Sequence, residues 1–512
     1  MNWGEVVSRT RRTGRLGRAR GAATVRIAFG VAAACVFAFG AALGILHAKP
    51  AAAAAKHASP ISWTTEGFNA MRTDYNGRES TIGPANAHHI HKLWSADLGA
   101  VMIAQPVEAA GVSVDGSLRS IVYEGTEHGE FYAIRASTGQ VIWEKDLGSQ
   151  ATNCFDMPDG VFGVGGAGAI SFTSKHAGVI YVAGGDGAVH ALDLATGAEE
   201  PGWPVQNVFD PVEESVYGGL NLFDNRLYVP IASHCSYPPY HGGLAEISVT
   251  GHAILHRFYP AGPPSGGISG GSVWGPGGVS VDPSSRDVIA ATGNALGRPY
   301  NYRYSESVVE LSPSLGVRSA VKPKLGSYAD EDFGSTPVVF RPAGCPVTLA
   351  AAENKTGALF VYSVGDKLGA RDSQRLQMGA YPRAGFKGDP AWDPVTNMLY
   401  VANTSNSTSG PFKHGLVALK AKSNCRLSLA WQRTIGLQKA IGLPPPSIAN
   451  GVVYYGDGAD NTEDAFEAAT GRELWQSSTI TGSVYAPATV VNGRVFVPSW
   501  NGKLYAFGVA KS

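Results

Sequence analysis

Apolar residues along most of this chain come in short runs that are separated by turn-forming residues. The stretch 131–148, FYAIRASTGQVIWEKDLG, shows the unit: an aromatic-rich apolar run, a Ser-Thr-Gly turn and a second apolar run. Short runs of aromatic and β-branched residues favour strands over helices. Gly139 supplies the positive φ that such a turn needs. The stretch therefore predicts two antiparallel strands joined by a tight turn.

The same unit recurs along the chain. Further first strands lie at 189–193, 244–247, 308–311, 359–362, 416–419, 465–467 and 504–507, several of them followed by Thr-Gly and a tryptophan strand. Another apolar strand precedes most of them, at 180–183, 227–230, 288–291, 399–402 and 495–498. Together with 131–134 they are eight first strands, spaced by roughly 40 to 65 residues as in propellers and solenoids. Each repeat then holds about four strands, and we predict an all-β fold.

The two ends of the repeat region complement each other. The last copy, 504–507, has no tryptophan strand after it, whereas 93–99 (LWSADLG) is a tryptophan strand without its partner. Pairing them would complete an eighth blade and remove an open sheet edge. We therefore predict an eight-bladed β-propeller closed by its N- and C-terminal strands. The recurrent tryptophans would pack between blades and bond loop carbonyls through their indole N–H groups; they are Trp94, Trp143, Trp203, Trp431 and Trp475.

The N-terminal part differs from the repeats. Residues 1–26 form a basic segment with seven arginines against Glu5, and 27–46 is continuously apolar or glycine, long enough to span a bilayer as a helix. Basic residues before such a span predict that this end stays in the cytoplasm. We predict a single-pass inner-membrane protein with residues 47–62 as a linker and 63–512 as a propeller on the periplasmic side. A cleaved signal peptide stays open as the alternative, because small residues follow the apolar run.

Charge and cysteine content narrow the possible functions. Lys+Arg and Asp+Glu balance at 41 each, which argues against nucleic-acid binding. We expect a monomeric propeller that contacts the membrane through its N-terminal helix and an unknown protein or small-molecule ligand at its axial face. Outside the apolar span lie Cys154, Cys235, Cys345 and Cys425, and three disulfide connectivities are possible. Proximity along the repeats favours Cys154 with Cys235 and Cys345 with Cys425.

The repeated Tyr/His-Ala-Leu/Ile, Thr-Gly and Leu/Ile-Trp pattern resembles the PQQ-like β-propeller repeat over about residues 90 to 508. That family includes quinoprotein alcohol dehydrogenases and non-catalytic relatives of the BamB type, so the resemblance specifies the fold and leaves the function open. The dehydrogenases bind their quinone and a calcium ion at the propeller axis. By this resemblance, Trp274 would form the floor under the quinone, Asn294 would ligate calcium, Asp332 would be the catalytic base and Lys355 would contact the quinone.

Departures from the family pattern keep two hypotheses open. The family has a glutamate ligand in the loop that corresponds to 233–242, but this loop has no acid here, and Glu213 and Glu214 lie upstream of it. The adjacent cysteine pair of the dehydrogenases and a CxxCH motif are also missing. One hypothesis is a binding or scaffold module. The other is a dehydrogenase that uses PQQ and calcium to oxidise an alcohol or a sugar. Each site residue also has a structural interpretation: a packing tryptophan, a turn asparagine, a solvated aspartate and a surface lysine. Convergence of the four on the ring axis would favour a ligand site.

Overall fold

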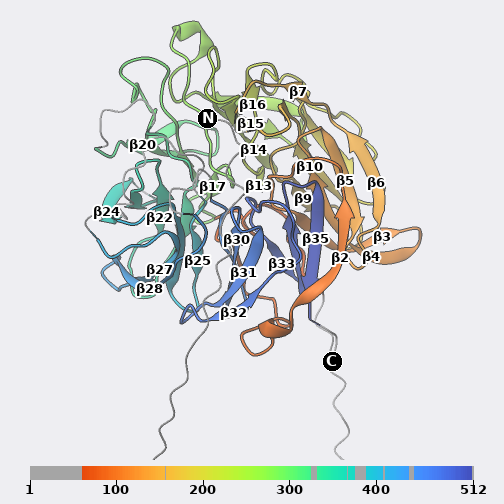
Figure 1. Cartoon of the computed structure of the whole chain (residues 1–512). Coiled ribbons are helices and arrows are strands. Elements are labelled where there is room, and N and C mark those ends of the chain that lie inside the picture. Colours follow the sequence, from red (N-terminus) through yellow and green to blue (C-terminus); the bar gives the residue numbers. More distant parts are fainter. Residues whose placement is uncertain are drawn as a thin grey trace, which may run out of the picture. The chain divides into compact units, whose positions relative to one another are not determined.

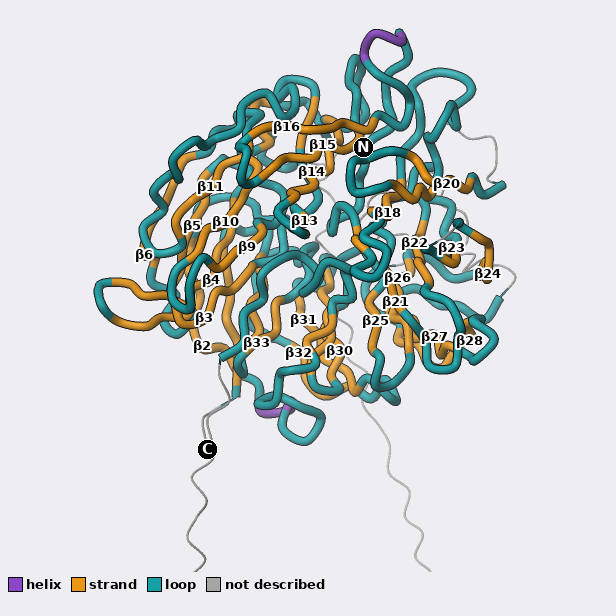
Figure 2. The backbone as a smooth tube through the Cα atoms, turned by 180° about the vertical axis from the view of Figure 1, so that it is seen from behind, coloured by secondary structure: helices purple, strands orange, loops and turns teal. Residues whose placement is uncertain are grey.

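The computed structural model describes residues 60–509 except 156, 325–330, 366, 375–387, 408–409 and 438–442. This part of the chain forms eight antiparallel blades arranged around a central axis (Figures 1 and 2). Its only helices are two short 3-10 segments, η1 (Ala87–His89) and η2 (Pro264–Gly266). The prediction of an all-β, eight-bladed propeller is confirmed.

Blades are numbered here in chain order. Blade 1 contains β3 (Val107–Val114), β4 (Ser117–Gly125), β5 (Glu130–Arg135) and β6 (Val141–Asp146); blade 2 contains β9 (Ala169–Phe172), β10 (Gly178–Ala183) and β11 (Val189–Asp193). Blade 3 contains β13 (Asn221–Phe223), β14 (Arg226–Ser233), β15 (Gly243–Ser248) and β16 (Ala253–Phe258); blade 4 contains β17 (Ser280–Val281), β18 (Val288–Ala291), β19 (Val308–Leu311) and β20 (Val317–Val321).

The remaining blades continue in the same order. Blade 5 contains β21 (Val338–Phe340), β22 (Leu349–Glu353), β23 (Leu359–Ser363) and β24 (Gly369–Gln374); blade 6 contains β25 (Ala391–Asp393), β26 (Met398–Asn403), β27 (Gly415–Ala421) and β28 (Leu427–Arg433). Blade 7 contains β29 (Ser447–Ala449), β30 (Val452–Asp457), β31 (Thr462–Glu467) and β32 (Glu473–Gln476); blade 8 contains β33 (Thr489–Val491), β34 (Arg494–Pro498), β35 (Lys503–Gly508) and β2 (His91–Asp97).

Blade 8 closes the ring as the sequence predicts. Strand β2 pairs antiparallel with β35, with Trp94 opposite Ala506 and Asp97 opposite Lys503. Blade 2 departs from the four-strand expectation, since only isolated bridges, such as Val189 to Val205, occupy its outer position. The segment there includes Pro201 and Pro204, which cannot donate to a ladder.

Tryptophans of the outer strands pack against the turn of the next blade. The indole N–H of Trp143 donates to Leu194 O at 3.2 Å, and those of Trp94 and Trp431 donate to Ala136 O and Ala468 O. A Cβ added to Gly197 would lie 2.7 Å from the Trp143 ring. Glycine in the Thr-Gly turn therefore supplies its positive φ and also leaves room for the tryptophan.

The segment 61–76 runs past the innermost strand of every blade. Trp63 exchanges backbone hydrogen bonds with Glu108 of β3, and the short strand β1 (Tyr75–Asn76) pairs parallel with β29. In between, the segment bonds the other six blades, through Ile170, Leu220, Val281, Val339, Trp392 and Val490. We call residues 61–76 the axial segment. It ties all eight blades together by contacts that strand periodicity cannot reveal.

Arg72 is the buried centre of the axial segment. It is 0% exposed, and its guanidinium donates to six acceptors that include the carbonyl oxygens of Gly277 and Gly219. Burial lowers the pKa of Arg72 to about 10 and raises the pKa of nearby Glu66 to about 8 and that of Asp389 to about 7. A fork of five N–H groups suits several carbonyls at once, which a lysine could not match.

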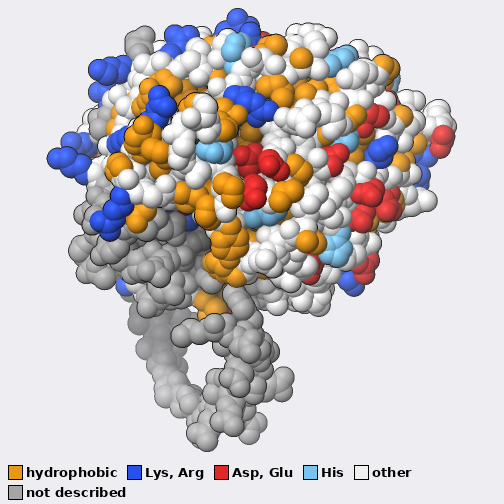
Figure 3. All heavy atoms as spheres, turned by 90° about the horizontal axis from the view of Figure 1, so that it is seen from above, with side chains coloured by type: hydrophobic (Ala, Val, Ile, Leu, Met, Phe, Trp, Pro, Cys, Tyr) orange, Lys and Arg blue, Asp and Glu red, His pale blue; other side chains and the backbone are white. Residues whose placement is uncertain are grey.

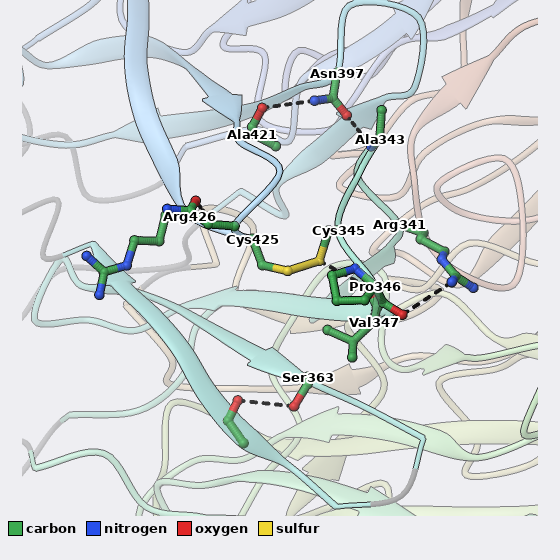
Figure 4. The surroundings of a disulfide bond; sticks show 12 residues. Arg341, Ala343, Cys345, Pro346, Val347, Ser363, Asn397, Ala421, Cys425 and Arg426 are labelled. Carbon is green, nitrogen blue, oxygen red and sulfur yellow. Dashed lines mark hydrogen bonds between the residues drawn. A yellow bond between two sulfur atoms is a disulfide. The ribbon is translucent and has the colours of Figure 1, made fainter.

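Both disulfides join neighbouring parts of the ring, and the favoured pairing is confirmed. Cys154 bonds Cys235, with the Cα atoms 5.3 Å apart, and Cys345 bonds Cys425, with the Cα atoms 5.1 Å apart. The second bond links the β21–β22 turn to the β27–β28 turn (Figure 4). Beside it, Asn397 donates to Ala421 O at 2.9 Å and accepts from the Ala343 N–H at 2.8 Å.

The predicted basic segment, membrane anchor and most of the linker lie outside the described residues. Among the residues that are described, no helix is long and apolar enough to cross a membrane.

Candidate functional site

The four residues that the family resemblance singles out lie at one end of the ring. In a blade of antiparallel strands, the loop between the second and third strands and the connection to the next blade leave at the same end. Asn294 and Lys355 lie on such loops, after β18 and β22. Trp274 and Asp332 lie on the connections that enter blades 4 and 5. We call this end the loop face.

Asp332 is the centre of this group. It is 0% exposed, and its Oδ2 accepts from Lys355 Nζ at 2.8 Å. Its Oδ1 accepts from the backbone N–H of Asn294, and its carbonyl oxygen accepts from the backbone N–H of Lys355 at 2.8 Å. The interpretation of Asp332 as a solvated loop acid is therefore wrong. A buried carboxylate held by an ammonium group and an N–H group joins blades 4 and 5.

Trp274 approaches the same carboxylate through Gly293. A Cβ on Gly293 would lie 2.6 Å from Trp274 Nε1 and 2.8 Å from Asp332 Oδ1, so only glycine fits between them. Trp274 is 4% exposed and Asn294 is 6% exposed. The Asn294 side-chain amide donates to Ala295 O at 3.0 Å. The structure therefore brings all four residues together in one cluster, in which Trp274, Asn294 and Asp332 are buried and the Lys355 side chain is 16% exposed.

Aromatic side chains cover the other side of Trp274. Its ring centroid lies 5.6 Å from that of Tyr217, which lies 5.2 Å from that of Phe162. Phe162 in turn packs 4.4 Å from the His234 ring. Cys154 of the first disulfide belongs to the same buried cluster. Trp274 thus forms one end of an aromatic row that runs toward the Cys154–Cys235 bond.

Two further residues reach this region: Tyr240 of the loop 233–242, which the sequence pointed to, and Glu214, which it placed only upstream of that loop. Tyr240 is buried beside Ser272, and burial followed by the charge of Asp332 raises its pKa to about 12. Glu214, which lies upstream in the chain, returns to the loop 233–242, because β12 (Glu214–Ser215) pairs with β14. Its Oε1 accepts from the His241 N–H at 2.9 Å. A short strand of two residues gives no periodic signal, so this return could not be read from the sequence.

The geometry can be tested against the quinone and the calcium ion that the fold family implies. A quinone stacked on Trp274 needs an open slot along one face of the indole, whereas this ring is 4% exposed and Asp332 is 0% exposed. Calcium takes six to eight oxygen ligands. Over the described ranges, no three His, Cys, Asp or Glu side chains are grouped so that they could hold a metal. In this arrangement the four residues do not fit a bound quinone and a calcium ion. Their roles toward these two groups stay predictions.

Comparisons with known proteins point to two kinds of relative. Residues 86–200 match the family model described as outer membrane protein assembly factor BamB. A quinohemoprotein alcohol dehydrogenase from Comamonas testosteroni is 26% identical over 539 aligned residues, which cover 86% of this chain and 73% of that protein.

Solved structures show the same fold. A europium-containing methanol dehydrogenase superposes with a TM-score of 0.62 at 13% identity and covers 88% of this chain and 98% of its own. BamB from Moraxella catarrhalis superposes with a TM-score of 0.52 at 14% identity and covers 82% of this chain and 99% of its own. The chain is thus similar to a quinohemoprotein alcohol dehydrogenase in sequence, matches the BamB-type model over residues 86–200, and shares the β-propeller fold of both kinds of protein.

Proposed function

We propose that this propeller is a non-catalytic binding module that holds a protein partner at its loop face. The observation that carries the proposal is the burial of the cluster around Asp332, where Lys355 and the Asn294 backbone hold both carboxylate oxygens. A side chain held in this way stabilises the ring and has no surface to offer a substrate. The match of residues 86–200 to an assembly factor supports the same proposal.

The proposal includes the membrane topology. Residues 27–46 would anchor the protein in the inner membrane, with the propeller on the periplasmic side, because an apolar span follows an arginine-rich segment. The two disulfides support an oxidising compartment. N-terminal sequencing of the mature protein tests whether the anchor is retained. An intact basic segment supports the anchor. A mature N-terminus within the alanines after Leu46 would show that residues 27–46 belong to a cleaved signal peptide.

A PQQ- and calcium-dependent dehydrogenase for alcohols or sugars is the second candidate. Convergence of Trp274, Asn294, Asp332 and Lys355 favours it, as does a dehydrogenase relative that covers most of the chain. Dye reduction by the full-length protein with added PQQ, calcium and a panel of alcohols and sugars separates the two candidates. We expect no turnover. Turnover that the variant Asp332→Asn abolishes would refute the binding-module proposal.

A further inference from the structure

Three loops of the loop face expose large apolar side chains close to the first disulfide. Phe155 is 70% exposed, Val212 is 65% exposed and Tyr237 is 45% exposed. Exposed prolines accompany them on the same loops. We call this set the apolar patch: Phe155, Pro158, Val212, Tyr237, Pro238 and Pro239. Gathered apolar side chains at a soluble surface are typical of contact sites.

The three loops are fastened to one another. The Cys154–Cys235 bond holds the Phe155 loop to the Tyr237 loop. Pairing of Glu214 with Ser233 holds the Val212 loop to the same strand end. The Tyr237 N–H donates to His234 O at 3.1 Å, which fixes the turn that carries the exposed ring. A surface fixed before binding loses little conformational entropy when a partner docks, so the patch is preorganised.

The loops that carry the patch contain acids and no basic residue of their own. The stretches 150–163, 206–218 and 233–242 contain no lysine or arginine, and their described acids are Asp159, Asp210, Glu213 and Glu214. Arg257 reaches the base of one loop, where its guanidinium donates to the carbonyl oxygens of Asn207 and Val208. Figure 3 shows one face of the molecule, on which acidic, histidine and basic side chains all lie among apolar ones. Because the whole chain carries no net charge, this acidity is a local feature.

We infer that the apolar patch docks a cationic, apolar segment of a protein partner. The inference rests on the proposed binding-module function and adds the chemistry of the partner. Apolar side chains of the partner would cover Phe155 and Tyr237, while its lysines or arginines would face Asp159 and Asp210. An anionic lipid surface would be repelled by the same acids, so a membrane is the less suitable occupant.

Two synthetic peptides of equal length test the inference on the full-length protein in detergent. One alternates lysine with leucine, and the other has glutamate in place of every lysine. Fluorescence anisotropy should show the lysine peptide binding at least about tenfold more tightly, with a preference that shrinks as salt rises from about 0.05 to 0.5 M. The double variant Phe155→Ser, Tyr237→Ser should lose about tenfold in affinity for the lysine peptide.

The matched control is Val395→Ser, since Val395 is 80% exposed on the β25–β26 turn at the opposite end of the ring. It should leave the affinity unchanged. Equal binding of both peptides, an unaffected double variant, or no binding of either peptide would overturn the inference. Binding to anionic phospholipid vesicles that depends on Phe155 would also overturn it and point to a membrane. None of these outcomes affects the dye-reduction assay with PQQ and calcium. That assay therefore tests the proposed function separately.

Discussion

The indole ring of Trp143 in blade 1 lies against Gly197 in the turn of blade 2, with its N–H bonded to Leu194 O at 3.2 Å. The contact explains why this position is a glycine, since any side chain there would meet the ring, and the turn separately requires its φ of +70°. The pair shows how a recurrent sequence motif joins one blade to the next.

Gly197→Ala should destabilise the protein more than Gly116→Ala. Both glycines have a positive φ, +70° and +73°, so both substitutions cost backbone strain. A Cβ at Gly116 meets nothing within 4 Å, whereas one at Gly197 lies 2.7 Å from the Trp143 ring. The extra cost at Gly197 should be about 1 to 3 kcal/mol in urea denaturation. Equal costs would mean that the ring moves aside freely.

Lys355→Met should be far more costly than the same change at Lys503. Lys355 is the 2.8 Å partner of fully buried Asp332, whereas Lys503 faces Asp97 at 3.8 Å on the surface. Loss of the first ammonium leaves a buried carboxylate poorly compensated, at a cost of about 2 to 4 kcal/mol. Loss of the second should cost at most about 1 kcal/mol. Equilibrium unfolding of the two variants measures the difference, and similar values would show that the Asp332 pair contributes little.

Arg72→Lys should destabilise the ring almost as much as Arg72→Met. Lysine keeps the positive charge beside Glu66 and Asp389 but cannot reach the six acceptors that the guanidinium bonds. We expect thermal unfolding at least several degrees lower for both variants. If lysine restored most of the stability, the positive charge and not the set of six hydrogen bonds would account for the contribution of Arg72 to the axial segment.

Stability should fall as the pH rises from about 5 to 8. Burial raises the pKa of Glu127 to about 8 and that of Glu108 to about 7, so the folded protein keeps protons that the unfolded chain releases near pH 4.5. The folded state therefore binds more protons in this window, and the free energy of unfolding decreases with pH. Burial lowers the pKa of His190, but its contacts with Asp186 and Glu199 outweigh burial and raise the pKa to about 9, so His190 contributes in the same direction above 6.5.

Glu127→Gln is the control for this pH dependence. A glutamine cannot ionise, so the slope of unfolding free energy against pH between about 5 and 8 should be shallower in the variant. Denaturant titrations at several pH values measure both slopes. An identical slope would show that Glu127 does not retain its proton in the folded protein.

The sequence predicted those parts of the fold that repeat. The strand pairs, the closure of Trp94 on Ala506 and the tryptophan contacts follow from patterns that recur along the chain. The disulfide pairing follows from the proximity of the cysteines along the repeats. The axial segment was missed, because it bonds every blade through backbone groups and one buried arginine and has no strand periodicity.

The sequence could predict which residues belong to the candidate site, but it could not predict that they are buried. Family motifs brought Trp274, Asn294, Asp332 and Lys355 into one group, which the structure places in contact. Their burial depends on Tyr217 and Tyr240, which arrive from other blades, so the closing of the cluster is a property of tertiary packing alone.

Titration of the full-length protein with PQQ, with and without calcium, tests the central claim most directly. Absorbance difference spectra report quinone binding, and Trp274→Ala is the matched variant for a stacked quinone. Because side chains of the protein itself fill the space around Trp274 and Asp332, we predict no saturable spectral change in either protein. Saturable binding that requires calcium and is lost in Trp274→Ala would contradict the account and establish an axial quinone site.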